Sequence, residues 1–155
     1  MYISFIQSED MRRTTLMVIT AIVTLSSCNT LKNTVDASSD LSKLGGRWEL
    51  NYISGPRIAF NGLYPGKKPE LLFEVPEKKF TGNSSCNSLS GKLVADDSSI
   101  NFNEPMITTK MACPGEGEAV FFEMLKKVNK YTVTEDTTLN FMMGDIAIMR
   151  FKKLN

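Results

Sequence analysis

Three cysteines are the most chemically versatile side chains in this chain of 155 residues: Cys28, Cys86 and Cys113. The sequence contains no histidine, so it lacks the side chain that most often acts as a base near neutral pH and most often binds metals. A thiolate at Cys86 or Cys113 would have only lysines such as Lys92 and Lys110 nearby in sequence to activate it. The sequence therefore disfavours a catalytic cysteine.

Cys86 and Cys113 form an even pair once Cys28 is set aside. In an oxidising compartment, a disulfide between them would close a loop of about 28 residues and contribute roughly 3 to 4 kcal/mol by the chain-entropy model. Two buried free thiols are the alternative. Structural zinc generally needs four ligands, so two thiolates without histidine do not predict a zinc site, and we expect no metal and no cofactor.

Two pairs of carboxylates could in principle serve as general acid and base. Glu116 and Glu118 stand at the start of a predicted helix, where carboxylates satisfy free amide groups and the helix dipole. Glu70 and Glu74 fall on the outward face of a predicted strand. Neither pair has a specific catalytic signature, and we expect the protein not to be an enzyme.

A polar stretch, GNSSCNS at residues 82–88, surrounds the second cysteine. Its Asn and Ser side chains could orient a ligand in a binding loop. We favour a bulged turn that places Cys86 against Cys113, with Asn87 capping local backbone groups.

The first cysteine ends the one long apolar run of the chain. Arg12 and Arg13 precede apolar residues 16–25, which are too few for a membrane-spanning helix and are typical of a secretory signal peptide. Leu25-Ser-Ser-Cys28 resembles the bacterial lipobox, which implies a diacylglycerol on Cys28 and cleavage just before it. An ordinary cleaved signal and an uncleaved anchor are the alternatives. Translation is expected to start at Met11, because the preceding Glu9 and Asp10 oppose the usual charge pattern.

Residues 1–27 are thus predicted to be a lipoprotein signal peptide and residues 28–43, rich in Ser, Thr, Asn and Asp, a flexible tether. Each buried CH₂ of an acyl chain contributes about 0.8 kcal/mol, so two or more chains would hold the protein on a membrane. Asn29 follows the cysteine in place of the Asp that often signals inner-membrane retention. We therefore expect a lipid-anchored protein of the bacterial envelope, on the outer membrane.

Residues 44–155 have the length and composition of one globular domain, in a chain that is 42% apolar and 23% charged. The net charge of +1 provides no field that would attract nucleic acid. We expect a monomer whose partner, besides the membrane, is an envelope protein or a small ligand.

Alternating apolar residues predict strands, and Phe121, Met124, Leu125 and Val128 share one face of a predicted helix over residues 118–130. Many short strands with a single helix predict a mainly β (α+β) fold, an antiparallel and barrel-like sheet with the helix at its open end. The predicted strands are residues 47–52, 70–75, 79–82, 90–95, 99–102, 139–142 and 146–151, with a further one near Ile107 and Thr109.

Several spaced motifs of this domain contain the residues Gly46, Trp48, Gly82, Asn87, Gly91, Thr109 and Met111. Together they resemble the META domain of heat-inducible HslJ-type proteins, over about residues 41–153. The resemblance implies a small antiparallel β domain with one helix, common on envelope lipoproteins, with no established enzymatic activity. Ser85 stands where the family commonly has glycine.

The segment 53–68, ISGPRIAFNGLYPGKK, is rich in Gly and Pro. It could be a recognition loop with Arg57, Phe60 and Tyr64 as anchors, or its aromatic rings could fold back onto the rim of the sheet. We expect a noncatalytic binding or interaction module linked to envelope stress. An envelope enzyme of unknown reaction and a purely structural lipoprotein are the rival hypotheses.

Overall fold

The computed structural model describes residues 40–155. The predicted signal peptide, the lipidation site at Cys28 and the tether up to residue 39 lie outside the described residues. Helix α2 (Asp40–Leu44) occupies the last residues that we assigned to the tether, and the side chain of Leu44 is fully buried. Ordered structure therefore starts before the predicted domain boundary at residue 44.

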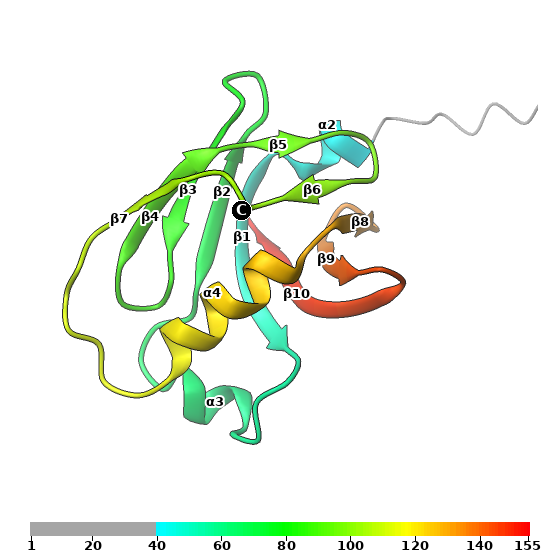
Figure 1. Ribbon diagram of the computed structural model, residues 1–155. Helices are drawn as coiled ribbons and strands as arrows, with labels where there is room; N and C mark the ends of the chain where they lie inside the picture. The colour runs from blue at the N-terminus through cyan, green and yellow to red at the C-terminus, as the bar shows by residue number, and fades with distance from the viewer. Residues whose placement is uncertain (1–39) are drawn as a thin grey trace, which may run out of the picture. The chain divides into compact units, whose positions relative to one another are not determined.

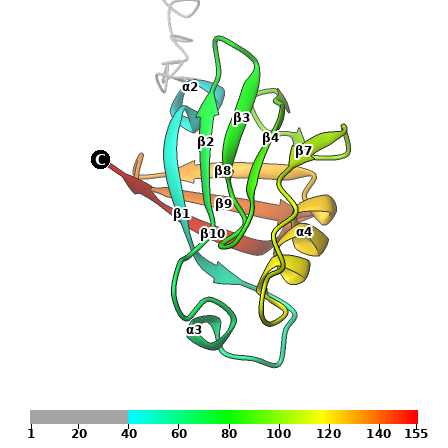
Figure 2. The same cartoon turned by 90° about the vertical axis from the view of Figure 1, so that its left-hand side faces the viewer.

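The predicted fold class is confirmed: the domain is built on one antiparallel sheet with few helices. Eight strands follow the order β7-β4-β3-β2-β1-β10-β9-β8 (Figure 1). Figure 2 shows that β1 to β4 and β7 cross β8 to β10 at a steep angle, so the sheet is strongly twisted. The strands are β1 (Gly46–Ile53), β2 (Glu70–Glu74), β3 (Lys79–Asn83), β4 (Ser88–Lys92), β7 (Met106–Thr108), β8 (Lys130–Thr134), β9 (Thr138–Met143) and β10 (Ile146–Leu154).

The sheet is not closed into a barrel, because β7 and β8 end the strand order and do not pair with each other. A hairpin of β5 (Val94–Ala95) and β6 (Ile100–Asn101) covers the edge of β8 instead. The amide of Tyr131 donates to the oxygen of Ser98 at 3.0 Å, and Ser99 forms an isolated bridge with Lys130. Helix α4 (Gly117–Lys127) lies across the opening (Figure 1).

The inner face of the twisted sheet encloses an aromatic core. Five aromatic rings form a connected series of contacts, with neighbouring centroids 5.0 to 6.2 Å apart. They belong to Phe73, Phe80, Phe102, Phe141 and Phe151. Helix α4 adds Phe121, Met124 and Leu125 of the predicted apolar face to this core, and Val128, directly after the helix, is buried as well. Burial of these large side chains, at about 25 cal/mol per Å² of apolar surface, is the main stabilising contribution.

Strand β1 departs from simple alternation near its end. Simple alternation along the predicted strand 47–52 would put Leu50 and Tyr52 on the same inner side, and Leu50 is buried, but Tyr52 is 40% exposed. The pairing of β1 with β10 shifts between Leu50 and Tyr52, so the bulge turns Ile53 into the core in place of Tyr52. Outside the core, the guanidinium of Arg150 lies 5.1 Å from the Tyr52 ring centroid.

The expectation of a single helix that continues to Lys130 is wrong. Helix α4 ends at Lys127, and Val128 adopts extended angles of −68° and 131°. The unpredicted strand β8 follows, with Tyr131 and Val133 buried on one side. The short helices α2 and α3 (Phe60–Leu63) were not predicted either.

Candidate functional site

Asn87 is the centre of a buried hydrogen-bond network between β4 and α4. Its side chain is 3% exposed. Its Oδ1 accepts from the Thr109 hydroxyl and from the Met111 amide, both at 2.8 Å. Its Nδ2 lies 3.1 Å from each of three acceptors, the Met111 oxygen, Cys113 Sγ and Glu118 Oε2. Asn87 therefore joins distant segments, and the prediction that it caps local backbone groups was wrong.

The disulfide between Cys86 and Cys113 fixes the same region covalently. Their Cα atoms lie 5.9 Å apart and the residues are 27 positions apart in sequence, which matches the pairing predicted from the cysteine count. Ser84, fully buried, donates its hydroxyl to the Glu118 carboxylate and accepts from the Asn87 amide at 3.2 Å. We call Ser84, Asn87, Thr109, Met111, Cys113 and Glu118 the Asn87 cluster.

The polar side chains of the Asn87 cluster form hydrogen bonds with one another. Both oxygens of Glu118 accept hydrogen bonds, from Ser84 and from Asn87. Within residues 40–155, no buried side-chain nitrogen or oxygen lacks a hydrogen-bond partner. Because these groups bond to one another across distant segments, the cluster holds the structure together, as we favoured for residues 82–88.

Ser85, in the tight turn of this cluster, adopts a left-handed backbone conformation with φ of 85°. Its amide donates to Asn83 Oδ1 at 3.0 Å, which supports the turn locally. A side chain at such an angle is strained, and glycine is not. A glycine at this position would adopt the same conformation without the strain.

Two motif glycines make room for their neighbours on the inner face. A Cβ atom at Gly82 would clash with the backbone oxygen of Glu70, and one at Gly91 would lie 2.8 Å from the Phe80 ring. Both positions therefore exclude larger side chains.

The remaining motif residues also have structural roles. Trp48 is fully buried and its Nε1 donates to the Leu44 oxygen at 2.8 Å, while Gly46 has a positive φ of 111°. The Met111 side chain is 59% exposed, so its part in the cluster is that of its backbone. None of these groups offers free reactive chemistry.

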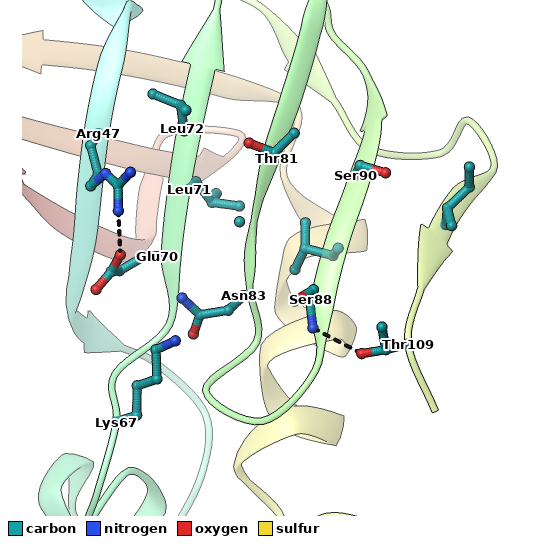
Figure 3. A pocket seen from close by; sticks show the side chains of 13 residues that line it. Arg47, Lys67, Glu70, Leu71, Leu72, Thr81, Asn83, Ser88, Ser90 and Thr109 are labelled. Carbon is teal, nitrogen blue, oxygen red and sulfur yellow. Dashed lines mark hydrogen bonds and ion pairs between the residues drawn. The ribbon is translucent and has the colours of Figure 1, made fainter. Parts of the chain in front are cut away.

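A different polar region lies on the outer face of β1, β2, β3, β4 and β7. Five side chains form one row across the strands, because register pairs Arg47 with Leu72, Leu72 with Thr81, Thr81 with Ser90, and Ser90 with Ile107. They line a hollow of about 490 Å³ that we call the outer groove (Figure 3). Other lining residues are Lys67, Glu70, Asn83, Ser88 and Thr109.

The outer groove is hollow because small side chains lie between large ones. Thr81 and Ser90 occupy its middle strands, while Arg47 and Lys67 stand on one side (Figure 3). On the other side Ile107 is 78% exposed. A ligand lying across the strands would meet hydroxyl groups in the centre, cations at one border and an apolar side chain at the other.

Three polar side chains of the outer groove have no partner among the described residues. The hydroxyls of Thr81 and Ser90 bond to no other residue among those described, and Lys67 forms no ion pair with any of them. Arg47 Nη1 lies 3.5 Å from Glu70 Oε2, a long and exposed ion pair. Thr81, Ser90 and Lys67 are therefore available to a ligand from solution.

The predicted recognition loop supplies fewer exposed anchors than we expected. Arg57 is exposed and Phe60 partly buried, but Tyr64 is only 4% exposed. The Tyr64 hydroxyl donates to the Gly117 oxygen at 2.9 Å, and burial raises the pKa of Tyr64 to about 12. Tyr64 thus folds back onto the domain, the alternative that we had left open, and cannot anchor a partner.

Sequence reasoning missed the outer groove. Only the alternation in β3 and β4, with Thr81, Ser88 and Ser90 on the outward side, pointed to a polar face there. Within residues 40–155, no three Cys, Asp or Glu side chains gather as metal ligands would. None of the described helices has the length and apolar character needed to span a bilayer.

An open antiparallel sheet, with a helix across its opening and a disulfide beside that helix, defines a small mainly β domain. Residues 39–155 match the META domain family, and the chain belongs to that family. No curated protein matches the sequence significantly.

Two solved structures are similar to this chain. A protein from Burkholderia xenovorans, solved by NMR, is 18% identical with a TM-score of 0.58, over 74% of this chain and 86% of its own. A DUF4847 family protein from Bacteroides vulgatus, solved by crystallography, is 17% identical with a TM-score of 0.49, over 72% of this chain and 96% of its own. The first similarity supports the fold and carries no functional assignment.

Proposed function

We propose that this META domain protein is a noncatalytic binding module of the bacterial envelope, held at a membrane by lipid on Cys28. The outer groove is its contact surface. The observation that carries this proposal is the row of outward side chains from Arg47 to Ile107, whose central hydroxyls, Thr81 and Ser90, have no partner in the described chain. A surface of this kind recognises a ligand by hydrogen bonding and charge without transforming it.

The alternative location for a site, the Asn87 cluster, favours no reaction. The Glu118 carboxylate accepts hydrogen bonds from Ser84 and Asn87 inside the protein, which supports a structural role for it. The sulfurs of Cys86 and Cys113 are bonded to each other and supply no thiolate.

The membrane part of the proposal rests on the sequence. Leu25-Ser-Ser-Cys28 follows a basic pair and an apolar run, and two or more acyl chains suffice for stable anchoring. The residues between Cys28 and Asp40 would give the domain freedom to meet partners near the surface.

Site-specific photocrosslinking in intact envelopes tests the groove. A photoreactive residue at Ser90 should yield a defined adduct that Thr81→Arg abolishes by filling the hollow. The same residue at Thr132, exposed on β8, should not yield that adduct. Equal adducts from both positions, or substrate turnover by the purified protein, would overturn the proposal.

The anchor is tested separately. Cys28→Ser should release the protein from the membrane fraction, and intact-mass analysis of the parent chain should show diacylglycerol on Cys28. An unmodified Cys28 would refute anchoring while leaving the groove to be judged by crosslinking.

A further inference from the structure

The two edges of the sheet are treated differently. The edge of β8 is covered, since Tyr131 bonds to Ser98 and the Ile100 amide donates to the Asn129 oxygen at 3.4 Å. No comparable backbone hydrogen bond leads from β7 to any described segment other than β4. The edge of β7 is therefore the unprotected edge within residues 40–155.

The register shows which backbone groups of β7 are free. The Thr109 amide donates to the Ser88 oxygen at 3.1 Å, and Ile107 pairs with Ser90 in the same register. In an antiparallel pair, alternate residues exchange hydrogen bonds with the partner strand. Ile107 and Thr109 thus face β4, and the backbone groups of Met106 and Thr108 face outward.

Space for another strand lies along this free edge. Two hollows, of about 490 and 470 Å³, share Thr108 and Phe122 as lining residues and so adjoin each other between β7 and α4. Figure 2 shows α4 beside β7 on this side of the sheet. Phe122 is partly buried against the core and gives both hollows an apolar wall.

The charges around these hollows favour an acidic occupant. Lys126 lines one hollow and Lys110 the other, and neither forms an ion pair with a described residue. The Glu118 carboxylate is already held by Ser84 and Asn87. Glu104 is the exposed carboxylate in the first hollow, so the free cations outnumber the free carboxylates.

We propose that β7 accepts an extended acidic segment of another protein as an added strand. Backbone groups of the segment pair with Met106 and Thr108, one of its apolar side chains contacts Phe122, and its carboxylates lie beside Lys110 and Lys126. Main-chain hydrogen bonds supply affinity in such strand addition, and side-chain contacts supply specificity. This site uses the free edge of β7, whereas the outer groove lies on the outer face and shares Thr109 with it, and the inference goes beyond the proposed function.

The length of β7 limits the interaction. Pro105 precedes this three-residue strand, so few backbone groups are available. Binding therefore depends on the flanking lysines as well as on the backbone, and it weakens as salt is raised.

The test uses the full-length chain and three synthetic nonapeptides of alternating sequence. The acidic probe alternates Val with Glu, the basic probe alternates Val with Lys, and the third is the acidic probe with Pro at its centre. The acidic probe should bind and shift the amide NMR signals of Met106 and Thr108. The other two should bind at least about tenfold more weakly, since a tenfold change corresponds to about 1.4 kcal/mol.

Two protein variants separate the backbone from the charges. Thr108→Pro removes an amide hydrogen that faces outward, so it spares the bonds to β4 and should weaken the acidic probe about tenfold. Lys110→Glu/Lys126→Glu should weaken it about three- to tenfold. Lys92→Glu, an exposed change on β4, is the matched control and should change binding less than about twofold.

Three results would overturn the proposal. The first is absence of binding by the acidic probe at millimolar concentration. The second is equal binding of the acidic and basic probes. The third is concentration-dependent self-association that shifts the same amides without any probe, which would assign the β7 edge to a second copy of this chain.

Discussion

The Asn87 cluster and the outer groove lie at neighbouring places on β3 and β4 but treat their polar groups in opposite ways. In the cluster, Ser84 and Asn87 are buried and bonded to other parts of the chain. In the groove, Thr81 and Ser90 face solvent and bond to no described residue. The comparison teaches that polar composition alone does not mark a binding site; what matters is whether the polar atoms are already paired.

Removing the disulfide should have the largest effect on stability, because it releases the segment around Cys113 from the segment around Cys86. Cys86→Ala/Cys113→Ala opens a loop closed over 27 residues, and the free energy of unfolding should fall by roughly 3 to 4 kcal/mol. Urea unfolding of the variant and of the oxidised parent measures the difference. A loss below about 1 kcal/mol would show that hydrogen bonds alone order the cluster.

Asn87→Ala should be the next most damaging change. It leaves the Thr109 hydroxyl and the Met111 amide without their common acceptor, so we expect a loss of about 2 to 3 kcal/mol in urea unfolding. Asn140→Ala is the matched control, because the Asn140 side chain forms no hydrogen bond with a described residue. Equal losses for the two variants would contradict the central role of Asn87.

Tyr64→Phe tests the hydroxyl that joins the loop after β1 to the start of α4. Loss of its bond to the Gly117 oxygen should cost about 1 kcal/mol. Burial raises the pKa of Tyr64 to about 12 from its ordinary 10.0, so the folded state holds the proton longer than the unfolded state. Stability due to Tyr64 is therefore complete below pH 10.0 and declines as the pH rises toward 12.

Between about pH 9 and about pH 11, the free energy of unfolding should decline less for Tyr64→Phe than for the parent chain. Some decline should persist, since burial also raises the pKa of Tyr131. An unchanged pH dependence in Tyr64→Phe would place Tyr64 in solvent.

Ser85→Gly should stabilise the protein, in contrast to the changes above. Relief of the left-handed strain at φ of 85° outweighs the extra freedom of glycine in the unfolded chain, and we expect a gain of roughly 0.5 kcal/mol. Thermal and urea unfolding would both report it. Destabilisation by this change would mean that the Ser85 side chain, and not its backbone, supports the turn.

Thr81→Ala and Ser90→Ala should have the smallest effect on stability. Their hydroxyls have no partner in the described chain, so each change should stay within about 0.5 kcal/mol. If the groove binds a ligand, the same variants should weaken the crosslink from its centre. A large loss of stability would show that Thr81 and Ser90, like Asn87, have a structural role.

Local sequence patterns predicted much of the fold. Alternation in β2 placed Leu71 and Phe73 in the core, and the spacing of Phe121 and Leu125 gave the buried face of α4. The pairing of Cys86 with Cys113 followed from their even number. These predictions succeeded because each depends on neighbours in sequence or on a single covalent choice.

The failures depended on distant contacts. The bulge in β1 that exposes Tyr52 arises from its register with β10, and the position of Tyr64 arises from contact with Gly117. Strand β8 was missed because the apolar period of α4 was extended past Lys127, although Tyr131 and Val133 alternate as a strand requires. Asn87 gave no local sign that its partners lay between 22 and 31 residues away.

The hairpin over β8 also sets an upper limit on assembly through the sheet. A sheet with two bare edges could recruit copies at both ends and grow into a fibre. Here the β5–β6 hairpin occupies one end, so any chain-to-chain pairing through β7 would stop at two molecules. Covering of the β8 edge therefore prevents open-ended growth of a sheet from molecule to molecule.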